Sequence, residues 1–156
     1  MAREIKVGAR APDFDLPADG DERLGLGAFK GQSVVLYFYP KDDTAGCTKE
    51  AIGFTAARDQ FAKIGAAVVG VSRDSVKTHE KFIKKHDLGV RLVADEDDAL
   101  CRKYGVWVEK SMYGRKYMGI ERATYLIDAK GVVRNIWRKV KVPGHVEAVL
   151  EAATAL

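Results

Sequence analysis

The sequence predicts a mixed α/β fold in which a central sheet carries helices on both faces. Strand-like apolar runs alternate with segments whose apolar residues recur at helical spacing, and a hairpin signal and a last helix follow. The first of these runs, Ser33–Tyr39, is apolar at nearly every position, which is typical of a central strand buried on both faces. Alternation of this kind predicts parallel strands joined by right-handed crossovers.

The individual elements follow from turn, cap and periodicity signals. An extended segment around Phe14 is expected to pair as a short hairpin with Arg23–Leu26, ahead of the central strand. The elements expected next are a helix from about Thr48 to Ile64, a strand at Ala66–Val71, a helix from Asp74 or Ser75 toward Gly89, a strand at Arg91–Ala94 and a short helix at Ala99–Tyr104. A loop-rich insert is expected at 106–119, and the elements after it are a hairpin of Ala123–Ile127 with Val132–Trp137 and a helix at His145–Ala155.

Length and composition indicate one ordinary globular domain over residues 1–156, with 47% hydrophobic and 31% charged residues. The 26 basic residues are interspersed with 22 acidic ones, so the net charge of +4 predicts neither a nucleic-acid nor a membrane partner. No apolar run approaches the ~20 residues of a membrane span, and the charged N-terminus is unlike a signal peptide. Two cysteines without a CxxC pair fit a reducing cytoplasm.

The stretch Tyr37–Glu50 carries the chemistry. The central strand stops at Pro40, a short polar turn follows, and Cys47 stands where a helix is about to start. Unpaired backbone N–H groups and the helix dipole favour an anion at such a place, and a thiolate is the anion that a cysteine offers. An inert buried thiol is the alternative for Cys47.

A thiolate alone would leave most of the catalysis unexplained. Lowering a thiol pKa from ~8.5 to ~6 raises the thiolate fraction about 30-fold, which is worth about 2 kcal/mol of barrier at most. Arg122, at the entry of a predicted core strand, is the best candidate for a cation beside the sulfur, and the hydroxyl of Thr44 could contact the sulfur or a substrate oxygen. Pro40 could shield the sulfur. Each also has an ordinary role, as a solvated charge, a turn hydroxyl and a strand terminator.

These residues resemble a known family. Pro40-x-x-x-Thr44-x-x-Cys47 is the signature of the peroxiredoxins, and the surrounding Tyr-Phe-Tyr-Pro-Lys-Asp-Asp-Thr-Ala-Gly-Cys-Thr-Lys-Glu resembles the bacterioferritin comigratory protein (PrxQ) branch. The further similar segments are Ala11-Pro12-Asp13-Phe14, Asp95-Glu96-Asp97, Tyr104-Gly105-Val106-Trp107 and Arg122-x-Thr124-Tyr125-Leu126-Ile127-Asp128. The resemblance covers nearly the whole chain.

The resemblance implies a thioredoxin fold with an added N-terminal hairpin, and a thiol peroxidase that reduces hydrogen peroxide and organic hydroperoxides. Cys47 would attack the O–O bond and become a sulfenic acid. Thr44 and Arg122 would bind the peroxide oxygens and stabilise the departing alkoxide, and Pro40 would keep water off the sulfenate. Glu50 resembles the residue that orients the arginine. No cofactor is expected, and His79, His86 and His145 have no Cys/Asp cluster beside them in the sequence that would predict a metal site.

The sequence departs from the branch at the second thiol. Ile52 and Ile83 occupy the two positions where relatives carry a resolving cysteine, which leaves Cys101 as the second thiol of the chain. Cys101 is either a structural thiol or a resolving one that acts after local unfolding or across a subunit interface. The preferred interpretation is a one-cysteine mechanism that uses thioredoxin, glutaredoxin or a small thiol, in a monomer or weak homodimer.

Two other classes of protein remain as alternatives on the same fold. A thiol–disulfide oxidoreductase needs a CxxC pair, and Thr44 stands where its first cysteine would be. A binding or chaperone-like module would make Cys47 incidental, since the fold alone does not fix a function.

Overall fold

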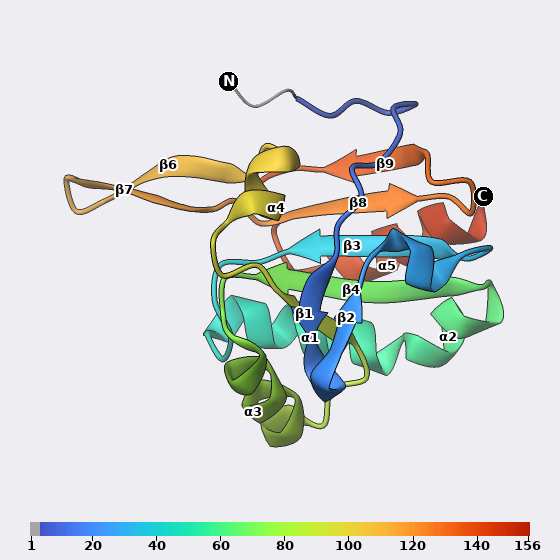
Figure 1. The fold of residues 1–156 in the computed structure, drawn as a ribbon, viewed down its shortest axis with the longest axis horizontal. Coiled ribbons are helices and arrows are strands. Elements are labelled where there is room, and N and C mark those ends of the chain that lie inside the picture. The colour runs from blue at the N-terminus through green and yellow to red at the C-terminus, as the bar shows by residue number, and fades with distance from the viewer. Residues whose placement is uncertain (1–3) are drawn as a thin grey trace.

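The computed structural model describes residues 4–156, which form a seven-stranded mixed sheet with helices on both faces (Figure 1). Its strands lie in the order β2-β1-β5-β4-β3-β8-β9. Their bounds are β1 Leu16–Ala18, β2 Glu22–Leu24, β3 Ser33–Phe38, β4 Ala66–Ser72, β5 Arg91–Ala94, β8 Ala123–Ile127 and β9 Val133–Trp137. The predicted mixed α/β fold is therefore confirmed. The N-terminal hairpin is also present, but its strands are Leu16–Ala18 and Glu22–Leu24 instead of the expected segment around Phe14 and Arg23–Leu26.

Strand β3 lies in the interior of the sheet, between β4 and β8, as its apolar sequence predicts. It pairs in parallel with β4 and antiparallel with β8, so that Leu36 stands between Val69 and Tyr125. β4 continues in parallel to β5, and β8 turns back into β9 through the predicted hairpin. The pairing of Phe38 with Ala123 places the end of β3 beside the start of β8.

The two faces of the sheet carry two separate hydrophobic clusters, because successive side chains of a strand point to opposite faces. Val34, Leu36 and Phe38 of β3 belong to one cluster, together with Leu100, Cys101 and Tyr104 from helix α4 (Ala99–Lys103) and its C-terminal end. The intervening side chains of β3 belong to the other cluster. That second face is covered by α1 (Ala45–Ala56), α2 (Arg58–Lys63) and α5 (His145–Thr154), and α3 (Val76–His86) adds Phe82 to it.

The long helix expected from Thr48 to Ile64 is wrong in two respects. Helix α1 begins three residues earlier, at Ala45, and the helical run is interrupted at Ala57, whose φ of −94° and ψ of 5° separate α1 from α2. The apolar periodicity continues across the break, since Phe54 and Phe61 pack on the same cluster. Periodicity alone therefore could not reveal the interruption.

The segment expected to be a loop-rich insert is instead a two-stranded ribbon, so that prediction is also wrong. Strands β6 (Trp107–Met112) and β7 (Arg115–Ile120) pair with each other in a separate sheet. Tyr113 and Gly114, at φ 52° and 77°, form the turn, and two consecutive positive φ values are those of a type I′ hairpin. The ribbon extends away from the body of the molecule (Figure 1).

No helix within residues 4–156 is long and apolar enough to cross a membrane.

Candidate active site

Cys47 is the third residue of helix α1 and not, as the sequence suggested, a residue ahead of the helix. Thr44 is the N-cap, with extended φ and ψ of −92° and 158°, and its carbonyl accepts the first bond of the helix from the N–H of Thr48. The N–H groups of Ala45, Gly46 and Cys47 have no acceptor within the helix, because no helical carbonyl lies four residues before them. The sulfur therefore lies in the first turn, where the dipole of α1 favours negative charge.

Arg122 reaches the sulfur from the strand next to β3. It immediately precedes β8, and the antiparallel pairing of β3 with β8 places it beside the loop that leads to Cys47. Its Nη2 donates a hydrogen bond to Cys47 Sγ at 3.3 Å, and its Nη1 donates to Glu50 Oε1 at 2.7 Å. A planar guanidinium can hold two acceptors at once in this fixed geometry, which a lysine cannot do.

Glu50 is completely buried one turn after Cys47. Burial raises the pKa of Glu50 to about 7, and the opposing charge of Arg122 offsets this only in part. Burial lowers the pKa of Arg122, but the charges of Glu50 and Cys47 and the hydrogen bonds to them together outweigh burial, so the net shift is upward. The second carboxylate oxygen, Oε2, is buried and has no hydrogen-bond partner among the described residues. Glu50 thus fixes the guanidinium, and its own protonation is poised near neutral pH.

Thr44 and Pro40 lie in the same loop. The hydroxyl of Thr44 donates to the carbonyl of Lys41 at 2.8 Å, so its oxygen remains available as an acceptor. That leaves Thr44 suited to accept a hydrogen bond from a peroxide O–H. Pro40 is partly buried and lines a hollow of about 480 Å³, which also contains Trp107, Lys110 and Tyr117 of the β6–β7 ribbon.

The sulfur itself is covered, since Cys47 is only 1% exposed. Lys110, on the ribbon, belongs to the same electrostatic environment. Burial lowers its pKa, the charge of Arg122 lowers it further, and Cys47 opposes both effects. Lys110 was not predicted as a site residue, because a loop-rich segment gives no reason to expect its lysine near Cys47.

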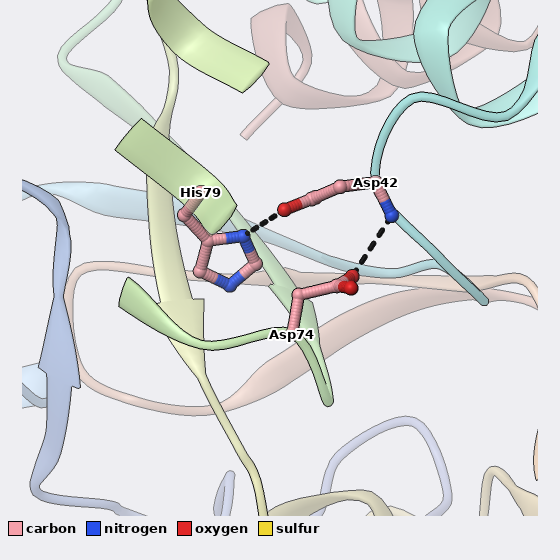
Figure 2. A group of neighbouring side chains, drawn as sticks. All are labelled: Asp42, Asp74 and His79. Carbon is pink, nitrogen blue, oxygen red and sulfur yellow. Dashed lines mark hydrogen bonds and ion pairs between the residues drawn. The ribbon is translucent and has the colours of Figure 1, made fainter. Parts of the chain in front are cut away.

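A second cluster stands directly behind the Pro40–Thr44 loop. Figure 2 shows Asp42, Asp74 and His79 converging there, with candidate metal-ligand atoms within 4.8 Å of one another. Asp42 Oδ2 lies 2.7 Å from His79 Nδ1, and the backbone N–H of Asp42 donates to Asp74 Oδ2 at 2.8 Å. The cluster therefore joins the Pro40–Thr44 loop to α3 and to the segment between β4 and α3.

The atoms of this cluster that could bind a metal ion already take part in hydrogen bonds. The Nε2 of His79 donates to the carbonyl of Val93 at 2.9 Å, because a carbonyl can only accept. The hydroxyl of Tyr39 donates to Asp42 Oδ1 at 2.5 Å, and the hydroxyl of Ser72 donates to Asp74 Oδ2. A metal ion would have to break the His79–Asp42 pair, so the arrangement fits a buried brace and not a metal centre.

Gly46 is a further site residue without a signal in the sequence alone. An added Cβ at this position would lie 3.1 Å from Arg122 Nη2 and 3.7 Å from its Cζ. The close approach that favours a glycine here comes from an arginine 76 positions later in the chain, and only the folded structure reveals it. The sequence shows Asp42 and His79 as polar residues next to buried elements, but it does not show that they pair with each other.

Cys101 is completely buried, and it belongs to the cluster on the sheet face opposite to that of Cys47. Its N–H and that of Leu100 donate to the buried carboxylate of Asp95, at 2.8 and 3.1 Å. Burial raises the pKa of the Cys101 thiol far above its ordinary value, and the charge of Asp95 adds to the effect. These surroundings keep Cys101 protonated and remote from the site.

Comparison with known proteins gives one consistent result. The AhpC/TSA family model matches residues 7–136. A putative peroxiredoxin Bcp of Coxiella burnetii is 53% identical over 146 residues, which cover 94% of this chain and 97% of that protein. A structure of Xylella fastidiosa PrxQ superposes with a TM-score of 0.93 at 40% identity, covering 99% of this chain and 98% of that one. A Xanthomonas campestris peroxiredoxin Q superposes with a TM-score of 0.87 at 48% identity, covering 91% and 90%.

The thioredoxin-like fold and the family match define the class, and the chain belongs to the AhpC/TSA family. Its high identity over almost the full length of these relatives places it more narrowly. It is a peroxiredoxin of the bacterioferritin comigratory protein, or PrxQ, branch, as the sequence resemblance indicated. The prediction of an enzyme is likewise confirmed.

Proposed function

We propose that this peroxiredoxin reduces hydrogen peroxide and organic hydroperoxides at Cys47, that it uses a thiol from outside the chain to complete the cycle, and that the whole chain acts as one domain. The observation that carries the proposal is the position of Arg122, whose two Nη atoms contact Cys47 and Glu50 together. A solved structure of Xanthomonas campestris bacterioferritin comigratory protein is described for its alkyl peroxide reduction activity, and that protein shares 48% identity with this chain.

The chemistry is a displacement at oxygen. The Cys47 thiolate attacks the nearer peroxide oxygen, the S–O bond forms as the O–O bond breaks, and the electron pair leaves with the distal oxygen. The products are a sulfenic acid on Cys47 and an alkoxide or hydroxide, which takes up a proton to become an alcohol or water. Arg122 and the N–H groups of the first turn of α1 stabilise the negative charge as it moves from sulfur to oxygen.

Each remaining residue has a distinct part in this step. Thr44 accepts the hydrogen bond of the peroxide O–H and orients the O–O bond. Pro40 limits access of water to the sulfenic acid. Glu50 acts as a positioning residue, because it contacts the arginine and not the substrate. Oriented donors of this kind contribute about 2.7–4 kcal/mol each in other enzymes, more than the thiolate fraction alone.

The one-cysteine cycle is supported by the surroundings of the other candidate positions. Ile52 and Ile83 offer no thiol, and Cys101 lies across the sheet from Cys47. An external thiol would therefore attack the sulfenic acid, release water and form a mixed disulfide, which a second thiol then resolves. We place this cycle in the reducing cytoplasm, with thioredoxin, glutaredoxin or a small thiol as reductant and the protein as a monomer or weak homodimer.

The test uses the reduced protein and one equivalent of peroxide. Wild type is expected to consume the peroxide and to gain one oxygen atom at Cys47 by mass, or a mixed disulfide when a small thiol is present. Cys47→Ser is expected to consume none. An intramolecular Cys47–Cys101 disulfide as the dominant product would overturn the one-cysteine cycle, and peroxide consumption by Cys47→Ser would overturn the assignment of the nucleophile.

A further inference from the structure

We propose that the β6–β7 ribbon is the docking arm for an acidic protein dithiol that reduces Cys47. This inference rests on the one-cysteine cycle proposed above and names the partner class of the same site. Within residues 4–156 the ribbon pairs with no strand of the main sheet, and it extends away from the body (Figure 1). Its residues line a hollow together with Pro40 and Lys41 of the Pro40–Thr44 loop, which we call the catalytic loop.

The ribbon exposes apolar side chains that the fold does not use. Met112, Tyr113, Tyr117 and Met118 are 55%, 98%, 44% and 48% exposed, respectively. Tyrosine and methionine are enriched at the centres of protein interfaces, and methionine adapts to irregular partner surfaces. An isolated two-stranded hairpin is only marginally stable in water, so a partner that covers one face would also stabilise the arm.

The charge of the arm selects the partner. Its residues 107–120 contain Lys110, Arg115 and Lys116 against the single acid Glu109. Lys41 and Arg73 add two cations to the lining of the adjoining hollow, which also contains the carboxylate of Asp74. A second copy of this chain has a net charge of +4 and would be repelled by the basic arm. An acidic partner would instead be attracted over the whole arm.

The arm also adjoins the loop that precedes Cys47. The hollow of about 480 Å³ has Tyr117 and Lys110 of the ribbon on one side and Pro40 of the catalytic loop on the other. A small anionic thiol would fit that hollow but would leave Met112 and Tyr113, at the far end of the ribbon, uncovered. The extent of the exposed surface therefore points to a protein.

The chemical step on this surface is balanced without any further reactant. One thiol of the partner attacks the sulfenic sulfur of Cys47, an S–S bond forms, and the hydroxyl leaves as water with the thiol proton. The second thiol of the partner then loses its proton to solvent and displaces Cys47, which leaves as a thiolate. The partner is oxidised to a disulfide and Cys47 is reduced.

The experiment compares two reductants on the same variants. The probe is a thioredoxin of net negative charge, regenerated by its reductase and NADPH, and dithiothreitol serves as the neutral small reductant. The arm variants are Arg115→Glu/Lys116→Glu, which reverses charge, and Met112→Ser/Tyr113→Ser, which removes apolar contacts. The matched control is Lys63→Glu/Lys130→Glu, which makes the same charge change on exposed lysines of α2 and the β8–β9 turn, away from the ribbon (Figure 1).

Both arm variants are expected to lower kcat/KM for thioredoxin by about tenfold, while dithiothreitol turnover and single-turnover oxidation of Cys47 stay within about twofold. The control should match wild type with both reductants. The rate of wild type with thioredoxin should fall as salt is raised, and that of the charge-reversal variant should fall much less.

Other outcomes would overturn the inference. Unchanged thioredoxin kinetics in both arm variants would exclude the arm as the docking surface. A wild type that turns over with small anionic thiols but not with thioredoxin would assign the hollow to a small molecule, and a dimer seen by sedimentation that the arm variants dissociate would assign the arm to a second copy. Failure of Cys47 to oxidise at all would instead overturn the proposed function, and that result is read separately.

Discussion

Gly46 faces Arg122 so closely that a single added carbon at Gly46 would touch the guanidinium. The Cβ would lie 3.1 Å from Nη2, the same atom that donates to Cys47 Sγ. Backbone and side chain are thus fitted to each other directly beside the sulfur of Cys47. The contact ties the conformation of the first turn of α1 to the position of the charge that we propose stabilises the leaving oxygen.

Gly46→Ala is therefore expected to slow the reaction with peroxide without unfolding the protein. The arginine must move by a few tenths of an ångström, and a misplaced donor of this kind costs about tenfold or more in rate. Stopped-flow measurement of Cys47 oxidation gives the rate, and urea unfolding should show stability within about 1 kcal/mol of wild type. The control is Gly27→Ala, where an added Cβ meets nothing within 4 Å. Equal rates for both variants would contradict the role of the contact.

Glu50 predicts a specific dependence of stability on pH. Its folded-state pKa of about 7 lies above the ordinary value of 4.5, so the folded protein binds the proton more tightly than the unfolded chain. The resulting stabilisation is complete below pH 4.5 and is lost as pH rises through 7, by up to about 3 kcal/mol. Wild type should therefore lose stability relative to Glu50→Gln over this range, measured by urea unfolding at several pH values.

His145 sets the background for that comparison. Burial lowers the pKa of His145 from 6.5 to about 4, with a further contribution from Arg122, so its effect on stability has the opposite sign: stability is lost as pH falls from 6.5 toward 4. Both proteins share this slope, which cancels in the difference. Parallel stability curves for wild type and Glu50→Gln would contradict the assigned protonation of Glu50.

The rate with peroxide should change less in Glu50→Gln than in Glu50→Ala, because the amide oxygen still accepts from Arg122.

The buried pair of His79 and Asp42 predicts a large loss of stability when one member is removed. His79→Leu leaves the Asp42 carboxylate buried beside an apolar group, which costs about 3–5 kcal/mol in comparable cases. Asp42→Leu/His79→Leu should recover part of the loss, since no unpaired charge remains. Urea unfolding of the three proteins gives the coupling energy. A rise in the Tm of wild type on adding zinc, abolished in His79→Leu, would instead identify a metal site.

Cys101→Ser is expected to separate structure from catalysis. Turnover with an external thiol should remain within about twofold of wild type, because the residue touches no part of the site. Stability should fall by about 1–3 kcal/mol, because a hydroxyl replaces a sulfur in an apolar cluster. Steady-state peroxidase assays and urea unfolding measure the two effects. Loss of turnover in a folded Cys101→Ser protein would support the resolving role.

The parts of the fold that follow local rules were predictable from the sequence. The apolar run of β3, the Ser75 cap of α3 and the turn between β8 and β9 each depend on neighbouring residues, and their structures agree with expectation. The β6–β7 ribbon was missed because it contributes little to a core, so its strands show no clear alternation. Its Tyr113–Gly114 turn was the available signal.

The site divides in the same way. Pro40, Thr44 and Cys47 form a short motif within eight residues. Arg122 was a candidate from its place at the start of a predicted strand, the resemblance strengthened it, and the resemblance alone supplied Glu50. Gly46 and the pair of Asp42 with His79 could not be derived, because each depends on a contact between segments distant in the chain. Spacing within a motif says nothing about the far side of such a contact.

The attachment of α3 to the catalytic loop affects the rate at which this loop opens. Asp42 is held by His79 near the start of α3, and Asp43 is held by Lys85 and His86 at its end, at 2.7 and 2.8 Å. Because both ends of the helix are tied to neighbouring residues of one loop, the two segments should exchange their amide hydrogens as a single cooperative unit. The lifetime of α3 would then limit how often the covered sulfur becomes accessible to another thiol.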